Sequence, residues 1–132
     1  MTLQQLQTDL TPFEIATLAA NTAESKKAID TKVMETGKIS SLSDYFVVCS
    51  ADSKTQVKAV TDAILEKLEK QGQRPEHYER DENGLWFLLD YGDTVIHVMN
   101  GNARQFYQLE KYWSHANIVD RDVWYQEERQ AS

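Results

Sequence analysis

The stretch LLDYGDTVIHVM, Leu88–Met99, decides how the rest of the sequence folds. Two apolar runs flank the pair Gly92-Asp93, and a two-residue connection between such runs predicts a β-hairpin. This connection pairs Tyr91 with Thr94, and every later pair follows from that one. Because side chains alternate along a strand, the pairing sorts the residues of both strands into two faces.

The two predicted faces of the hairpin differ in composition. One face is wholly apolar and should pack beneath helices; it holds Leu85, Phe87, Leu89, Ile96 and Val98. The other face mixes apolar and polar side chains: Trp86, Leu88, Asp90, Val95, His97 and Met99. A sheet face buried under helices of the same chain rarely carries charged side chains, and a face exposed to solvent rarely carries a tryptophan. The mixture predicts an interaction surface with an aromatic anchor and a few polar groups that fix orientation.

Simpler interpretations of the same residues stay open from sequence. His97 fits a half-buried histidine whose hydrogen bonds are satisfied within the chain. Asp90 and Asp93 fit ordinary turn chemistry, because Asp side chains accept hydrogen bonds from nearby backbone N–H groups. Trp86 fits a core position.

Outward from the hairpin, the sequence alternates helical and strand patterns. Upstream we expect a helix from Pro12 to about residue 26, a strand over 28–34, a loop over 37–44, a buried strand over 45–49 and a helix from about residue 53 to Gly72. A polar connection follows, with a short edge strand near His77. Downstream, Asn102 is expected to cap a third helix whose buried stripe is Phe106, Leu109 and Trp113.

Two local signals mark where the two longer helices begin. Thr11 with Glu14, and Ser53 with Gln56, have the spacing of capping boxes. The second helix has a buried stripe at spacings of 3, 4 and 4, made of Val57, Val60, Ile64 and Leu68. The pattern predicts a single compact α/β domain with a mixed sheet, divided into a tail (1–11), the domain (12–114) and a C-terminal extension (115–132). We expect the extension to be loosely held, with docking through Val123, Trp124 and Tyr125 as the alternative.

Composition limits the class of protein and its partners. The chain has 132 residues, of which 41% are hydrophobic and 27% are charged, which is globular composition. Its formal net charge of −7 disfavours direct binding to nucleic acid and favours a basic partner. The single cysteine, Cys49, excludes a disulfide framework and fits a reducing, cytosol-like compartment. We found no apolar run long enough to span a membrane and no targeting peptide.

Enzyme chemistry has weak support in the sequence. Three histidines and one cysteine form no paired metal-ligand motif, no glycine-flanked serine elbow is present, and no cofactor is indicated. The stretch CSADSKTQ, Cys49–Gln56, is a strand-to-helix turn that could hold an anion at the helix start, but it lacks the glycines of phosphate-binding loops. A nucleotide-binding protein is therefore the alternative class, and a domain that only self-associates is a third.

Four stretches together resemble the ribosomal silencing factor family, also called Iojap-like proteins. They are SLSDYFVVCSADS (41–53), QVKAVTDAILEKL (56–68), LWFLLDYGDTVIHVM (85–99) and ARQFYQLEKYWS (103–114), and the resemblance covers about residues 12–114. It implies an α/β fold related to nucleotidyltransferases but without their activity. It also implies a homodimer when free, and binding to ribosomal protein number fourteen of the large ribosomal subunit. Such binding would block joining of the small subunit and repress translation, notably when nutrients are short.

The family pattern falls on named positions of this sequence. Its SD falls at Ser43-Asp44, and its hairpin motif at Trp86, Leu88, Leu89, Asp90, Tyr91, Gly92, Asp93, His97 and Val98. Its last motif falls at Arg104, Tyr107, Leu109, Glu110 and Trp113. The sequence departs from the pattern at Ala51, at Asn100–Ala103 and in the length beyond Ser114. The expected surface for the ribosomal protein is Trp86, Leu88, Asp90, Tyr91, Asp93, His97, Arg104, Tyr107 and Glu110.

Overall fold

A six-stranded sheet organises the molecule, with strand order β3-β4-β5-β2-β1-β6. The structure is a computed structural model and describes residues 10–37, 44–107, 111 and 116–126. The strands are β1 (Ile29–Glu35), β2 (Tyr45–Ala51), β3 (His77–Arg80), β4 (Trp86–Asp90), β5 (Thr94–Asn100) and β6 (Asn117–Val119). Strands β2 and β5 run parallel and the other neighbours antiparallel, so the sheet is mixed as predicted.

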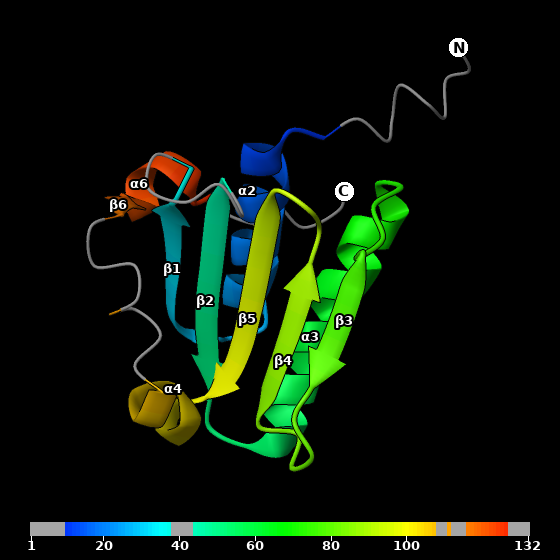
Figure 1. The fold of residues 1–132 in the computed structure, drawn as a ribbon, viewed down its shortest axis with the longest axis vertical. Coiled ribbons are helices and arrows are strands. Elements are labelled where there is room, and N and C mark those ends of the chain that lie inside the picture. Colours follow the sequence, from blue (N-terminus) through cyan, green and yellow to red (C-terminus); the bar gives the residue numbers. More distant parts are fainter. Residues whose placement is uncertain (1–9, 38–43, 108–110, 112–115, 127–132) are drawn as a thin grey trace.

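Two helices, α2 (Pro12–Ser25) and α3 (Lys54–Lys70), lie on the same side of the sheet (Figure 1). The core fills the space between them and the sheet. It includes the predicted α3 stripe, whose four residues are fully buried, and the apolar hairpin face of Phe87, Leu89, Ile96 and Val98. Both predictions are confirmed except at Leu85, which precedes β4 and is only partly buried. The opposite side of the sheet is therefore not covered by these two helices.

The predicted helix ends are largely confirmed. Thr11 and Glu14 form a reciprocal capping box, with hydrogen bonds of 3.0 and 3.1 Å. Ser53 accepts from the Gln56 backbone N–H at 3.1 Å. The prediction that the Gln56 side chain bonds back to the Ser53 backbone is wrong, because that side chain donates instead to the Lys26 carbonyl at 2.5 Å. The turn between α2 and β1 lies close to this side chain. The spacing of residues along the sequence does not reveal that proximity.

The third helix, α4 (Gly101–Tyr107), begins earlier than expected. Asn102 already lies inside it, so the prediction that Asn102 caps the helix is wrong. Asn100 takes that place, because its side-chain oxygen accepts from the Asn102 N–H at 3.1 Å. The predicted stripe of Phe106, Leu109 and Trp113, and most of the loop over 37–44, lie outside the described residues or side chains.

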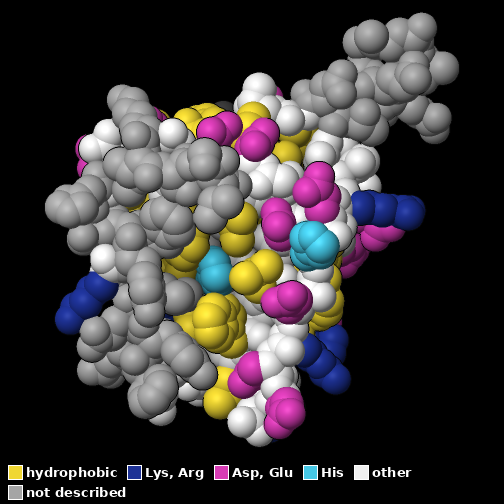
Figure 2. Space-filling model, in the orientation of Figure 1, with side chains coloured by type: hydrophobic (Ala, Val, Ile, Leu, Met, Phe, Trp, Pro, Cys, Tyr) yellow, Lys and Arg dark blue, Asp and Glu magenta, His cyan; other side chains and the backbone are white. Residues whose placement is uncertain are grey.

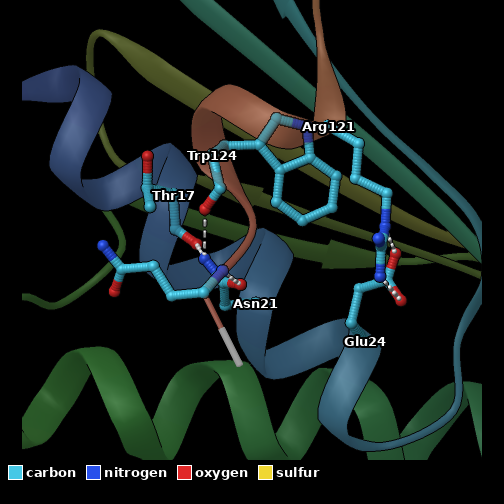
Figure 3. A network of polar contacts seen from close by, with 6 residues as sticks. Thr17, Asn21, Glu24, Arg121 and Trp124 are labelled. Atoms are coloured by element: carbon cyan, nitrogen blue, oxygen red, sulfur yellow. Dashed lines mark hydrogen bonds and ion pairs between the residues drawn. The ribbon is translucent and has the colours of Figure 1, made fainter. Parts of the chain in front are cut away.

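The expectation of a loosely held C-terminal extension is wrong for residues 116–126. Strand β6 pairs with β1, and the short helix α6 (Arg121–Trp124) inserts Trp124 into the core at 1% exposure. Asn21 of α2 donates to the Trp124 carbonyl and accepts from the Gln126 N–H, both at 2.7 Å. Arg121 pairs with Glu24 at 3.2 Å, and Figure 3 shows this network. Of the three residues in the docking alternative, Trp124 is docked, whereas Val123 and Tyr125 are exposed, at 64% and 37%.

Candidate docking surface

The mixed hairpin residues lie together on the side of the sheet away from α2 and α3. Cross-strand pairs join Trp86 to Met99, Leu88 to His97 and Asp90 to Val95, which is the predicted register. We call these six residues the outer face. Figure 2 looks onto this side and shows hydrophobic side chains in its middle, with Asp and Glu beside them.

Accessibility divides the outer face into two parts. His97 and Met99 are buried, at 5% and 0% exposure. Trp86, Leu88 and Val95 are only partly buried, so their apolar surface is within reach of a partner. An accessible tryptophan with a leucine and a valine beside it has the composition of a protein interface core. The apolar part of the predicted surface is therefore centred on β4.

His97 is tied into the protein more closely than the sequence indicates. The Trp86 indole Nε1–H donates to His97 Nδ1 at 2.9 Å, and the Phe46 ring lies 4.5 Å from the imidazole, centroid to centroid. Burial lowers the pKa of His97 to about 4, because a charged imidazolium loses hydration there. His97 is neutral at pH 7, and with Nδ1 accepting, its proton sits on Nε2.

The turn between β4 and β5 uses its two aspartates differently. The Asp90 side chain accepts from the Gly92 N–H at 2.8 Å, and Gly92, which has no Cβ, adopts a left-handed φ of +90°. Asp93 contributes its backbone carbonyl, which accepts from the N–H groups of Asp44 and Tyr45 at 2.7 and 3.0 Å. The Asp93 residue is exposed. Turn chemistry thus accounts for Asp90, and Asp93 offers an acidic group to a partner.

Two further acidic residues border the outer face, and sequence reasoning missed both. Glu79 of β3 pairs with Leu88 across the strands and is exposed. Glu76 is also exposed, and its backbone N–H donates to the Asp90 carbonyl at 2.7 Å. Both lie in the polar stretch after Gly72 that the sequence pattern predicts to be a loop between two elements. Alternation along the expected edge strand puts Glu79 on the same face as His77, but it does not give the register of that strand against β4.

The structure places two predicted site residues elsewhere. Tyr91 packs against the core cluster on the helix side, and burial raises its pKa. Arg104 is 6% exposed and donates to the Asp30 carbonyl at 2.6 Å and the Ser50 hydroxyl at 3.0 Å. Arg104 thereby ties α4 to β1 and β2. The side chain of Tyr107, and Glu110 altogether, lie outside the described residues.

The alternative sites have little support in the described part of the chain. There, no group of three or more His, Cys, Asp or Glu side chains is placed to hold a metal ion. Burial raises the pKa of Cys49 to about 12, so this thiol is unreactive. At the start of α3, the Ser53 side chain already accepts an N–H that an anion would need. No helix within the described ranges has the length and apolar character to cross a membrane.

Comparison with known proteins decides the family. The sequence matches the family described as "Ribosomal silencing factor during starvation" over residues 9–132. The chain belongs to the ribosomal silencing factor family. It is 33% identical to the ribosomal silencing factor of Bacillus subtilis, over 82% of this chain and 92% of that protein. A chloroplastic Iojap protein of Zea mays is 28% identical, over 82% of this chain and 47% of its own length.

Solved structures agree with this assignment. A crystal structure of a protein from Chromobacterium violaceum superposes with a TM-score of 0.76 at 32% identity, covering 93% of this chain and 94% of that one. A second structure, from Bacillus halodurans, gives a TM-score of 0.68 at 33% identity, covering 78% and 93%. The family is one of non-enzymatic silencing factors, in agreement with the weak catalytic signals of the sequence.

Proposed function

We propose that this chain binds the large ribosomal subunit through ribosomal protein number fourteen, using the outer face. The observation that carries the proposal is the accessible apolar group of Trp86, Leu88 and Val95 on the side of the sheet that α2 and α3 leave uncovered. A partly exposed tryptophan is the residue type that most often carries binding energy at a protein interface. Family membership supports the ribosome as the partner.

Charge supports a basic partner. The chain carries a net charge of −7, and Asp93, Glu76 and Glu79 are exposed around the hairpin. Carboxylates at the rim of an interface attract a positively charged partner and speed the encounter, while apolar contacts at the centre hold the complex. Asp93 and the two glutamates would meet Lys or Arg side chains of the ribosomal protein. Binding should weaken as salt is raised.

The proposed mechanism is steric. A protein seated on the face of the large subunit that meets the small subunit prevents the two from joining, and so represses translation, notably under nutrient limitation. No chemical step is needed, because occupancy alone excludes the small subunit. We place this action in the cytosol-like compartment that the sequence favours.

We further propose that the free chain is a homodimer. An accessible apolar surface is unfavourable in water, so a second copy is a natural cover for it when the ribosome is absent. Measuring the mass in solution over a range of concentrations tests this. A monomer at all concentrations would remove the proposal without affecting ribosome binding.

Co-sedimentation with isolated large and small ribosomal subunits, at two salt concentrations, tests the proposed function. We expect the protein to travel with the large subunit alone, and less of it at the higher salt. Binding to neither subunit would refute the proposal. In that case, a thermal shift with nucleotides and magnesium would test the alternative class, since a nucleotide that binds the native state must raise its stability.

A further inference from the structure

The Trp86 indole is held by a hydrogen bond within the chain. Its Nε1–H donates to His97 Nδ1 at 2.9 Å, and the two ring centroids are 5.7 Å apart. Trp86 pairs across the strands with Met99, so the indole leans diagonally along the outer face to reach His97. Tryptophan has one N–H donor and no acceptor. The indole therefore has no polar group left to offer a partner and presents carbon surface.

His97 is itself held by packing against Phe46 of the neighbouring strand β2. Its exposure is 5%, and the Phe46 ring lies 4.5 Å away at an interplanar angle of 32°. Phe46 is 4% exposed and packs in a small buried cluster with Met34 and Val48. A chain of contacts thus runs from Phe46 on β2 through His97 on β5 to Trp86 on β4. A side chain held in this way has few alternative rotamers.

We propose that His97 is a positioning residue for docking: it accepts the Trp86 indole N–H and holds the ring in the orientation that the partner meets. This inference rests on the proposed function and adds a division of labour to it, with Trp86 as the contact and His97 as its support. A side chain ordered before binding spares the complex the entropy cost of ordering it. Losing the acceptor should therefore weaken binding by roughly 2- to 13-fold, the range for immobilising one side chain.

Two substitutions separate the acceptor from the ring. His97→Phe keeps an aromatic ring against Phe46 and removes the acceptor. His97→Asn removes the ring and places an amide oxygen near the position of Nδ1. The indole N–H signal in a ¹H–¹⁵N spectrum reports the hydrogen bond, and its loss in Trp86→Phe assigns it. Affinity for the large subunit reports docking, and thermal unfolding reports folding.

We expect His97→Phe to fold, to shift the Trp86 indole signal and to bind more weakly, and His97→Asn to recover both signal and affinity in part. In a Trp86→Phe background, His97→Phe should cause no further loss, because the two residues act as a unit. An equal loss in that background would make His97 a direct contact and overturn the proposal. Full affinity with a shifted indole signal would also overturn it.

Failure of the proposed function gives a different result. If the wild-type protein does not bind the large subunit, the docking role is lost for both residues. The indole signal of His97→Phe then still decides whether the hydrogen bond exists. If His97→Phe shifts the indole signal but the wild type does not bind the large subunit, the ribosomal proposal is refuted. If the wild type binds and His97→Phe binds equally well, only the role of His97 is refuted.

Discussion

At the scale of single residues, the sequence predicted the hairpin register but not the directions of every side chain. A two-residue loop fixes all later pairs, so the pairing of Leu88 with His97 and of Trp86 with Met99 followed from Gly92-Asp93 alone. Arg104 and Tyr91 could not be placed in this way. Arg104 turns inward because Asp30, with its left-handed φ of +53°, brings a carbonyl to it from 74 positions away. No local pattern records such a contact.

The buried histidine makes stability depend on pH. Its pKa is about 4 in the folded protein and 6.5 when exposed, so the unfolded chain binds a proton first as pH falls. Stability is therefore unaffected by His97 above pH 6.5 and is lost progressively as pH falls toward 4. Between pH 7 and 5 the wild type should lose about 2 kcal/mol more than His97→Phe. Urea unfolding of both proteins at the two pH values measures this; equal losses would show that His97 is not buried and neutral.

At the scale of elements, long periodic segments were predictable and short ones were not. Helix α3 repeats its apolar spacing over about three turns, and its stripe is fully buried as expected. Strand β6 has three residues, too few for alternation to be recognised. Helix α6 has four, too few for a helical apolar stripe to repeat. Tertiary contacts, not local pattern, hold this C-terminal segment.

This segment should contribute to the stability of the whole domain. Trp124→Ala removes a side chain that is 1% exposed and leaves a cavity in the core, so it should cost about 3–5 kcal/mol. Val123→Ala is the matched control, because Val123 is 64% exposed, and it should change stability by less than about 0.5 kcal/mol. Chemical denaturation compares the two variants. Equal stabilities would mean that the segment is not docked in solution.

At the scale of the whole molecule, α2 and α3 cover one side of the sheet (Figure 1). On the other side His97 and Met99 are buried, whereas Trp86, Leu88 and Val95 stay partly accessible. The composition predicted the acidic character of the molecule, and the hairpin pattern predicted the apolar group on its outer face. The extent of the acidic border was not predictable, because Glu76 and Glu79 join the surface only through the pairing of β3 with β4. The proposed docking surface is thus a property of the assembled sheet.

The most direct test of the central claim is the affinity of three variants for the large ribosomal subunit, measured side by side with the wild type. Trp86→Ala should lose at least ~2 kcal/mol, about 30-fold, as an interface anchor does. Asp93→Lys should also weaken binding, because it reverses a charge facing a basic partner. Asp62→Lys makes the same charge change on α3, across the molecule from the outer face, and should bind like the wild type. Wild-type affinity in both Trp86→Ala and Asp93→Lys would contradict the assignment of the outer face as the docking surface.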